Sequence, residues 1–221
     1  MDSYISLSIS RTSCCCTTFD FNRSASPKIH VMRLSISFYA ALLGLSASVA
    51  AGSDPLTSGQ PVPQFDLPYA FQGAEYVASP SDVDAIRNTL ALYPLAIDGK
   101  NFPALGLVFA TNAVANYSAP LNVLTPLSTI ESALEASLAP VTTQHSFGTQ
   151  VIDILSPNTA VSVTYYTATH FGIGQFAGQI VTAYGQYQDV WDKQEDKSWR
   201  ICHRNLVFMV RRCVLHHLAP K

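Results

Sequence analysis

Two hydrophobic periods divide the chain. Between residues 79 and 140 the apolar positions recur at helical spacing, and from residue 149 to 210 they alternate with a period of two. The first helix is expected to begin near Ser79, with Pro80 in its first turn, and to end at Gly99. Its apolar stripe predicts the buried face: Val83, Ile86, Leu90, Tyr93 and Ile97.

Two shorter helices and a strand are expected before the alternating region. Asn101 can cap a short helix that runs to Phe109, and residues 113–117 read as a strand. A third helix is expected to start at a capping box from Ser128 to Glu131, and Pro140 should end it.

The second half of the chain reads as an antiparallel meander. The strands are expected over residues 149–155, 159–171, 175–191 and 199–210. On the second of these strands, alternate residues share one face: Ser162, Thr164, Tyr166, Ala168 and His170. Helices followed by a run of strands are typical of an α+β fold with helices packed on one face of a curved sheet.

The N-terminal 78 residues show neither of these two patterns and are expected to lie outside the folded domain. Residues 1–31 carry no core pattern and form a doubtful extension, whereas Met32 begins a charged, then apolar, then small-residue stretch through residue 51. That order is typical of a secretory signal peptide, with an N-terminal anchor as the alternative, and it predicts a secreted protein. Residues 52–78 read as a Pro/Gly/Ser-rich arm, residues 79–210 as the folded domain, and residues 211–221 as a tail.

Composition narrows the function classes. Hydrophobic residues make up 48% of the chain and charged residues 13%, so it can bury a core, and the net charge of −2 argues against a nucleic-acid surface. The cysteines lack zinc-ligand spacing. A disulfide between Cys202 and Cys213 and a pair of free thiols both remain open.

Three polar residues suggest a site, and each comes from a different predicted element: Asp98, His145 and His170. A carboxylate bound to one imidazole would fix its tautomer, while the other imidazole moves a proton. Tyr117 could donate a hydrogen bond to a developing enolate oxygen. Such a site needs no metal or cofactor, although two histidines and an aspartate could also bind a metal ion.

Four short segments carry a family resemblance. Residues 93–102, 115–117, 143–148 and 168–170, in this order and spacing, make the region from residue 81 to 209 resemble scytalone dehydratase and its SnoaL-like relatives. These proteins belong to the superfamily of nuclear transport factor 2 and ketosteroid isomerase. The resemblance implies a cone-shaped α+β barrel of a curved, mainly antiparallel sheet wrapped around the helices and enclosing a deep pocket.

The resemblance also implies roles for residues. A carboxylate at the position of Asp98 pairs with a histidine at the position of His170, and a histidine at the position of His145 handles the proton. A tyrosine at the position of Tyr117 polarises a carbonyl together with a second tyrosine just before the carboxylate, where this chain has Ile97. The late-strand asparagine of the family falls at Gln186 or Tyr187 in this chain.

These features favour a cofactor-independent lyase, dehydratase-like, or an isomerase acting on a small cyclic ketone or polyketide-like molecule. His145 would be the acid/base, His170 its partner, Asp98 the orienting residue and Tyr117 the carbonyl donor. The alternative is a secreted protein of the same fold that binds a small hydrophobic ligand without catalysis. In both cases the expected partner is a small molecule. We expect no nucleic-acid partner and, after signal cleavage, no membrane partner. A homo-oligomer also fits the fold, and so does a role as a scaffold domain.

Overall fold

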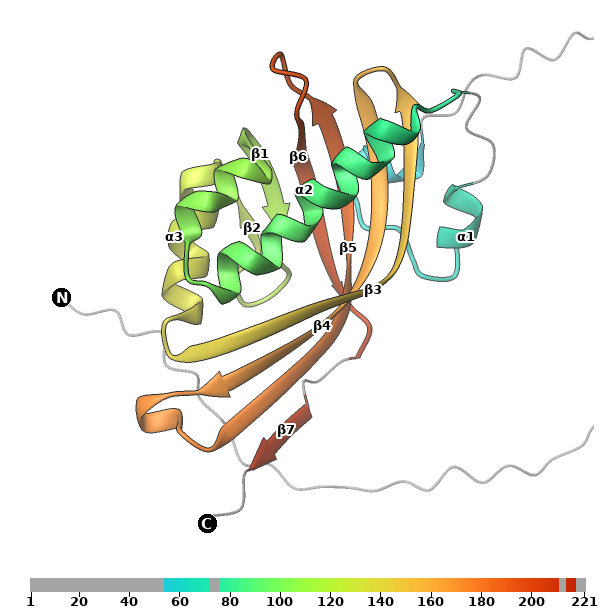
Figure 1. Ribbon diagram of the computed structural model, residues 1–221. Helices are drawn as coiled ribbons and strands as arrows, with labels where there is room; N and C mark the ends of the chain where they lie inside the picture. The colour runs from blue at the N-terminus through green and yellow to red at the C-terminus, as the bar shows by residue number, and fades with distance from the viewer. Residues whose placement is uncertain (1–53, 72–75, 211–213, 218–221) are drawn as a thin grey trace, which may run out of the picture. The chain divides into compact units, whose positions relative to one another are not determined.

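The computed structural model describes residues 54–71, 76–210 and 214–217. The chain divides into two units, residues 1–48 and 49–221, and every described residue lies in the second. The expected signal peptide, the extension before it and Cys213 therefore lie outside the described residues. The structure contains these elements: η1 Pro55–Ser58, α1 Leu67–Ala70, α2 Pro80–Asp98, η2 Phe102–Leu107, β1 Phe109–Asn116, β2 Val123–Leu124, α3 Leu127–Leu138, β3 Val141–Ser156, β4 Thr159–Gly172, η3 Gly174–Phe176, β5 Gln179–Lys193, β6 Trp199–Phe208 and β7 Val214–His217 (Figure 1).

The first helix confirms its apolar stripe. Four of the five stripe residues are buried in the core, and Val83 packs at its edge. α2 ends at Asp98 with Gly99 as its C-cap residue, as expected, and it contains Pro94. The cap is different: the Ser79 hydroxyl forms a hydrogen bond with the Ser81 hydroxyl (2.7 Å) and caps no backbone amide.

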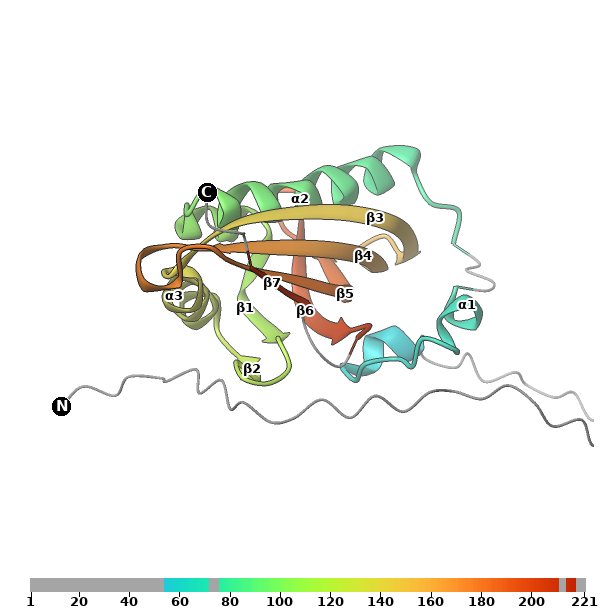
Figure 2. The same cartoon turned by 90° about the horizontal axis from the view of Figure 1, so that it is seen from below.

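The strands form one mixed sheet in the order β2-β1-β6-β5-β4-β3. β3 to β6 form the antiparallel meander, while β1 joins β6 in parallel. β3 is longer than predicted and begins at Val141, so the polar stretch around His145 lies inside a strand rather than before one. The sheet curves, and α2 lies across one of its faces, the inner face (Figures 1 and 2).

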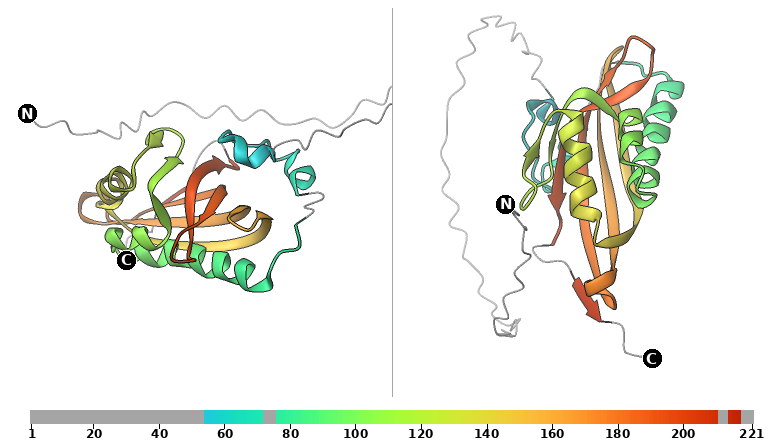
Figure 3. Two further views of the ribbon diagram at one scale, coloured as in Figure 1. Left: turned by 90° about the horizontal axis from the view of Figure 1, so that it is seen from above. Right: turned by 90° about the vertical axis from the view of Figure 1, so that its left-hand side faces the viewer.

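Residues 54–71 of the predicted arm lie against part of the opposite, outer face of the sheet (Figures 2 and 3). Leu56, Val62 and Leu67 of the arm pack on outer-face valines of β4 and β5 and form a second hydrophobic core. The amide of Gln188 on β5 holds the arm by donating to the Val62 carbonyl and accepting from the Val62 amide, both at 2.7 Å. The arm is thus part of the folded domain.

Three local predictions differ from the structure in detail. The short helix after Asn101 is present as the 3₁₀ helix η2, which ends at Leu107, so Phe109 belongs to β1. α3 begins at Leu127 after Pro126 and has no side-chain cap, so Ser128 lies inside the helix rather than at a capping box. Part of the predicted tail is a strand, because β7 pairs with the start of β5 beyond the end of β6. Within the described part of the chain, no helix is long and apolar enough to cross a membrane.

Candidate active site

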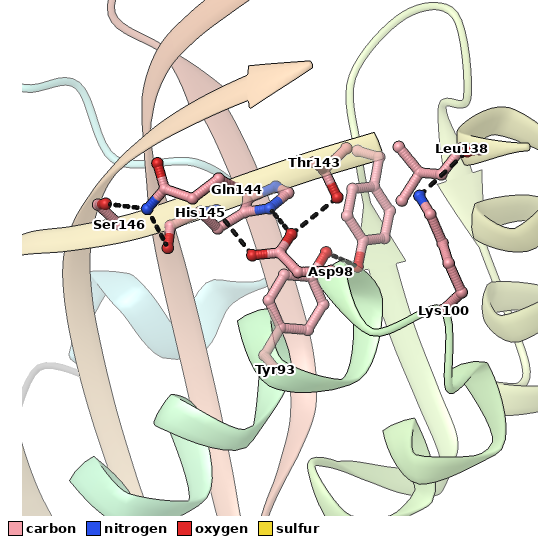
Figure 4. A network of polar contacts seen from close by, with 9 residues as sticks. Tyr93, Asp98, Lys100, Leu138, Thr143, Gln144, His145 and Ser146 are labelled. Carbon is pink, nitrogen blue, oxygen red and sulfur yellow. Dashed lines mark hydrogen bonds and ion pairs between the residues drawn. The ribbon is translucent and has the colours of Figure 1, made fainter. Parts of the chain in front are cut away.

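Asp98 joins the end of α2 to β3 through three hydrogen bonds (Figure 4). Its Oδ1 accepts from the Thr143 hydroxyl (2.7 Å) and lies 2.7 Å from Nδ1 of His145. Its Oδ2 accepts from the backbone amide of His145 (2.8 Å). Thr143 and His145 alternate with exposed residues along β3 and so share the inner face of the sheet. The carboxylate therefore fixes both the strand and the imidazole ring.

This contact sets the tautomer of His145. An ionised Asp98 only accepts hydrogen bonds, so in the neutral form of His145 the proton lies on Nδ1 and Nε2 keeps its lone pair. Burial alone would raise the pKa of Asp98, but the bonds from His145 and Thr143 outweigh it and hold that pKa below its ordinary value. The side chain of His145 is 6% exposed and that of Asp98 24%, so the carboxylate is the more exposed member of the pair.

His170 lies beside His145 on the inner face. Thr143 is paired with His170 across β3 and β4, which makes the two histidines diagonal neighbours with ring centroids 6.0 Å apart. Burial lowers the pKa of His170, the neighbouring His145 and Lys100 lower it further, and Asp98 opposes them. Nδ1 of His170 is buried without a hydrogen-bond partner. His170 is therefore a neutral imidazole at pH 7 with a free ring nitrogen.

A pair of tyrosine hydroxyls lies next to the histidines. The hydroxyls of Tyr93 and Tyr117 are 3.0 Å apart, and the Tyr93 ring packs edge-on against the His145 ring at 6.5 Å. Burial raises the pKa of both phenols well above 10, so both remain protonated and can donate hydrogen bonds.

A buried ion pair lies behind the tyrosines. Nε and Nη2 of Arg204 donate to the two carboxylate oxygens of Asp189 at 2.7 and 2.8 Å, and both side chains are fully buried. The guanidinium lies over the rings of Tyr187 (4.1 Å) and Tyr93 (4.5 Å). Its third nitrogen, Nη1, is buried without a hydrogen-bond partner.

Lys100 closes one side of this region. Its ammonium group donates to the carbonyl of Leu138 at the end of α3 (3.1 Å; Figure 4). The bond links the turn after Asp98 to the segment that leads into β3, the two parts of the chain that carry the carboxylate and His145.

Comparison with known proteins identifies the family. The family described as "SnoaL-like domain" matches residues 79–205, more than half of the chain. The chain belongs to the SnoaL-like family. No curated protein matches it by sequence.

Solved structures show that this SnoaL-like domain has the fold of the nuclear transport factor 2-like superfamily. A superfamily member from Salmonella enterica aligns with a TM-score of 0.54 and 16% identity over 61% of this chain and 95% of its own. A protein from Novosphingobium aromaticivorans assigned as a scytalone dehydratase aligns at 0.55 and 20% over 63% and 90%. A hexachlorocyclohexane dehydrochlorinase, LinA type 2, aligns at 0.55 and 12% over 63% and 94%.

The structure brings together the four residues expected at the site of the SnoaL-like domain, but in a different arrangement. Asp98 pairs with His145, not with His170, because His145 stands where the end of α2 meets β3. Ile97 is buried in the core, and the tyrosine partner of Tyr117 comes from Tyr93, one helical turn earlier on the same stripe. In the sequence, Tyr93 belongs to the apolar stripe and to a segment that carries the resemblance, and neither assigns a role to its hydroxyl.

Two further expectations concern the later strands. Tyr187 faces the inner core, where it stacks on Tyr166 with centroids 4.6 Å apart, whereas its neighbour Gln186 points to the outer face. Arg204 and Asp189 were missed, because a single charged residue on a predicted strand gives no sign of its partner. Cys202 is a free thiol whose pKa burial raises to about 12.

Buried side chains of α2, β1, β5 and β6 pack together on the inner face, and the deep pocket that the resemblance implies stays a prediction. A hollow of about 450 Å³ lies in the arm, lined by residues of the 55–70 segment. Among the described residues, no cluster of three His, Cys, Asp or Glu side chains has the geometry of a metal site.

Proposed function

We propose that this SnoaL-like domain is a cofactor-independent lyase or isomerase that removes a proton next to a carbonyl of a small cyclic ketone or polyketide-like molecule. The observation that carries the proposal is the Asp98–His145 pair. One oxygen of Asp98 bonds the backbone amide of His145 and the other bonds its ring Nδ1. Nε2 of the ring is then left to act as a base.

The chemistry divides between a base and an electrophilic group. Nε2 of His145 takes the proton, the C–H electron pair moves into the carbonyl, and the oxygen becomes an enolate. Asp98 stabilises the imidazolium that results. A phenol of the Tyr93–Tyr117 pair donates a hydrogen bond to the enolate oxygen. Tyr93 thereby takes the place of the second tyrosine of the family, whose position is occupied by Ile97 in this chain.

The enolate can then collapse in two ways. In a dehydration, the electron pair forms a carbon–carbon double bond, and a β-hydroxyl leaves with a proton from an imidazolium as water. In an isomerisation, the imidazolium returns its proton to another carbon. His170 is available as a second proton carrier, because its free nitrogen lies on the same face as His145. The dehydratase and dehydrochlorinase names of two structural neighbours support an elimination.

The deciding experiment follows absorbance during turnover of hydroxylated cyclic ketones by the chain from Ala51 onward. His145→Ala should abolish turnover and leave thermal unfolding almost unchanged. Gln144→Ala is the matched control, because Gln144 is the exposed neighbour on the same strand. Full turnover by a folded His145→Ala variant would refute the role of His145.

The rival function is ligand binding without catalysis. The hollow of about 450 Å³ in the arm favours it, because that hollow lies away from His145. Tight binding of a cyclic ketone that is recovered unchanged, with equal affinity for wild type and His145→Ala, would support this function instead.

A further inference from the structure

Thr143 has one histidine along its own strand and the other across the ladder. His145 lies two residues further along β3 on the same inner face, and His170 is the residue of β4 that pairs with Thr143. Directly opposite residues of an antiparallel pair have Cβ atoms about 5 Å apart. The Thr143 hydroxyl donates to the Asp98 carboxylate at 2.7 Å (Figure 4). At this point of the sheet the carboxylate is therefore close to both imidazoles.

Acceptor capacity does not explain why Asp98 binds only one of the two rings. An ionised carboxylate has about four lone-pair sites. Asp98 accepts three hydrogen bonds, from the Thr143 hydroxyl and from the backbone amide and ring of His145. Nδ1 of His170 is nevertheless buried without a hydrogen-bond partner. The orientation of the carboxylate must therefore be what separates it from His170.

Two rigid donors hold this orientation, one on each carboxylate oxygen. The Thr143 hydroxyl donates to Oδ1 of Asp98 at 2.7 Å, and the backbone amide of His145 donates to Oδ2 at 2.8 Å. The amide is part of the strand, and a threonine side chain is stiff about χ1 because it branches at Cβ. Ring Nδ1 of His145 meets the same Oδ1 at 2.7 Å. Without the hydroxyl, the amide would hold Oδ2 and leave Oδ1 free to turn toward His170.

We propose that Thr143 is a positioning residue that selects His145 over His170 as the imidazole that Asp98 orients. The proposal rests on the proposed function, in which His145 takes the proton and His170 is a second proton carrier. Thr143 would thus give two neighbouring histidines of one site different roles, although it touches neither the substrate nor the reacting atoms.

This selection has a consequence for the protonation of His170. Burial lowers the pKa of His170, the nearby His145 and Lys100 lower it further, and Asp98 opposes them. On the other neighbouring strand, the residue opposite His170 is the uncharged Val181. A carboxylate that turned toward His170 would stabilise the charged ring and raise its pKa. The neutral form of His170 therefore depends on the carboxylate staying with His145.

The first test is NMR of the histidine ring nitrogens, which distinguishes the two neutral tautomers and needs no substrate. Thr143→Val removes the hydroxyl and keeps the shape of a good strand former. In this variant the pKa of His170 should rise, and the Nδ1–H form of His145 should no longer dominate. Thr143→Ala, which also lacks the hydroxyl, should behave in the same way.

Two control variants should keep the wild-type behaviour of both rings. Thr143→Ser retains the hydroxyl and loses only the methyl group. Thr142→Val makes the matched substitution at the exposed neighbour on the same strand. Wild-type tautomers and an unchanged pKa of His170 in folded Thr143→Val or Thr143→Ala would overturn the proposal.

Turnover provides a second readout. In Thr143→Val we expect kcat to fall about tenfold to a hundredfold, the effect of losing a hydrogen bond to a charged group, with KM almost unchanged. Thr143→Ser should restore kcat. A fall in kcat while both rings titrate as in the wild type would also overturn the proposal. Absence of turnover in the wild type would instead refute the proposed function, and the NMR titration would still decide the role of Thr143.

Discussion

Asp98 and His145 are joined twice, once from the backbone amide to Oδ2 at 2.8 Å and once from ring Nδ1 to Oδ1 at 2.7 Å. The first bond fixes where the residue stands, and the second fixes which ring nitrogen carries the proton. Position and protonation of the proposed base therefore depend on one carboxylate.

Replacement of this carboxylate should affect turnover more than folding. In Asp98→Asn the amide can present its NH₂ to Nδ1, which favours the wrong tautomer of His145 and removes the charge that stabilises the imidazolium. We expect kcat to fall about 10²- to 10⁴-fold. Asp84→Asn, on the exposed side of α2, is the control and should keep wild-type kcat. Steady-state kinetics would contradict this role of Asp98 if both variants had similar kcat.

His170 should make stability depend on pH in a defined direction. Because the folded-state pKa of His170 is depressed, the unfolded chain binds the proton more readily. The stability contributed by the neutral ring is present above the unfolded pKa of about 6.5 and is lost as pH falls through it. Asp98, Lys100 and His145 are the charged or titratable groups that act on this ring.

Thermal unfolding of wild type and His170→Gln between pH 5 and 8 (a window of roughly one to two units around the unfolded pKa) measures this effect. The wild-type Tm should fall toward the acid end, and the variant should lose less stability over the same range. Parallel curves of Tm against pH for the wild type and His170→Gln would contradict the depressed pKa of His170.

Removal of one partner of the Asp189–Arg204 ion pair should destabilise the protein more than replacement of both partners by apolar residues. Asp189→Asn leaves a fully buried guanidinium without its counter-ion, and we expect a loss of about 3–5 kcal/mol in the free energy of unfolding. The double variant Asp189→Leu/Arg204→Met should cost less than the sum of its two single changes. Urea unfolding of the wild type, Asp189→Leu, Arg204→Met and the double variant forms the double-mutant cycle. Strict additivity of the losses in unfolding free energy would argue against coupling between the two residues.

The arm should be released by one substitution on the sheet. Gln188→Leu removes both hydrogen bonds to the Val62 backbone and leaves a buried amide and carbonyl unpaired, at about 1–3 kcal/mol for each group. Limited proteolysis should then cut near Val62 faster than in the wild type, while the Asp98–His145 contact stays intact. Gln64→Ala, which loses only an exposed bond to Tyr165, is the control. Equal cutting of both variants would show that Gln188 does not hold the arm.

Periodicity predicted the fold because burial repeats along each element. The stripe on α2 and the alternation on β4 are properties of local sequence, and both faces were placed correctly. The residues of the proposed site could be named for the same reason, since a polar residue on a buried face needs an explanation.

The pairing inside the site could not be read from the sequence. Which histidine meets Asp98 depends on the register of β3 against β4, and that register is set by contacts across the whole sheet. The role of Tyr93 could not be predicted, because in the sequence it is one of several large apolar residues in a helical stripe. Its hydroxyl enters the site only because Tyr117, directly after β1, lies beside it. The same holds for Arg204, whose partner Asp189 lies on the neighbouring strand.

The arm has a practical consequence for how the protein can be produced. The family match begins at residue 79, and a chain cut there would lack Leu56, Val62 and Leu67. Val161, Val163 and Val190 would then face water as an exposed apolar patch, the kind of surface through which chains aggregate. The folded domain therefore begins upstream of the family match, and expression trials should retain the residues from 54 onward.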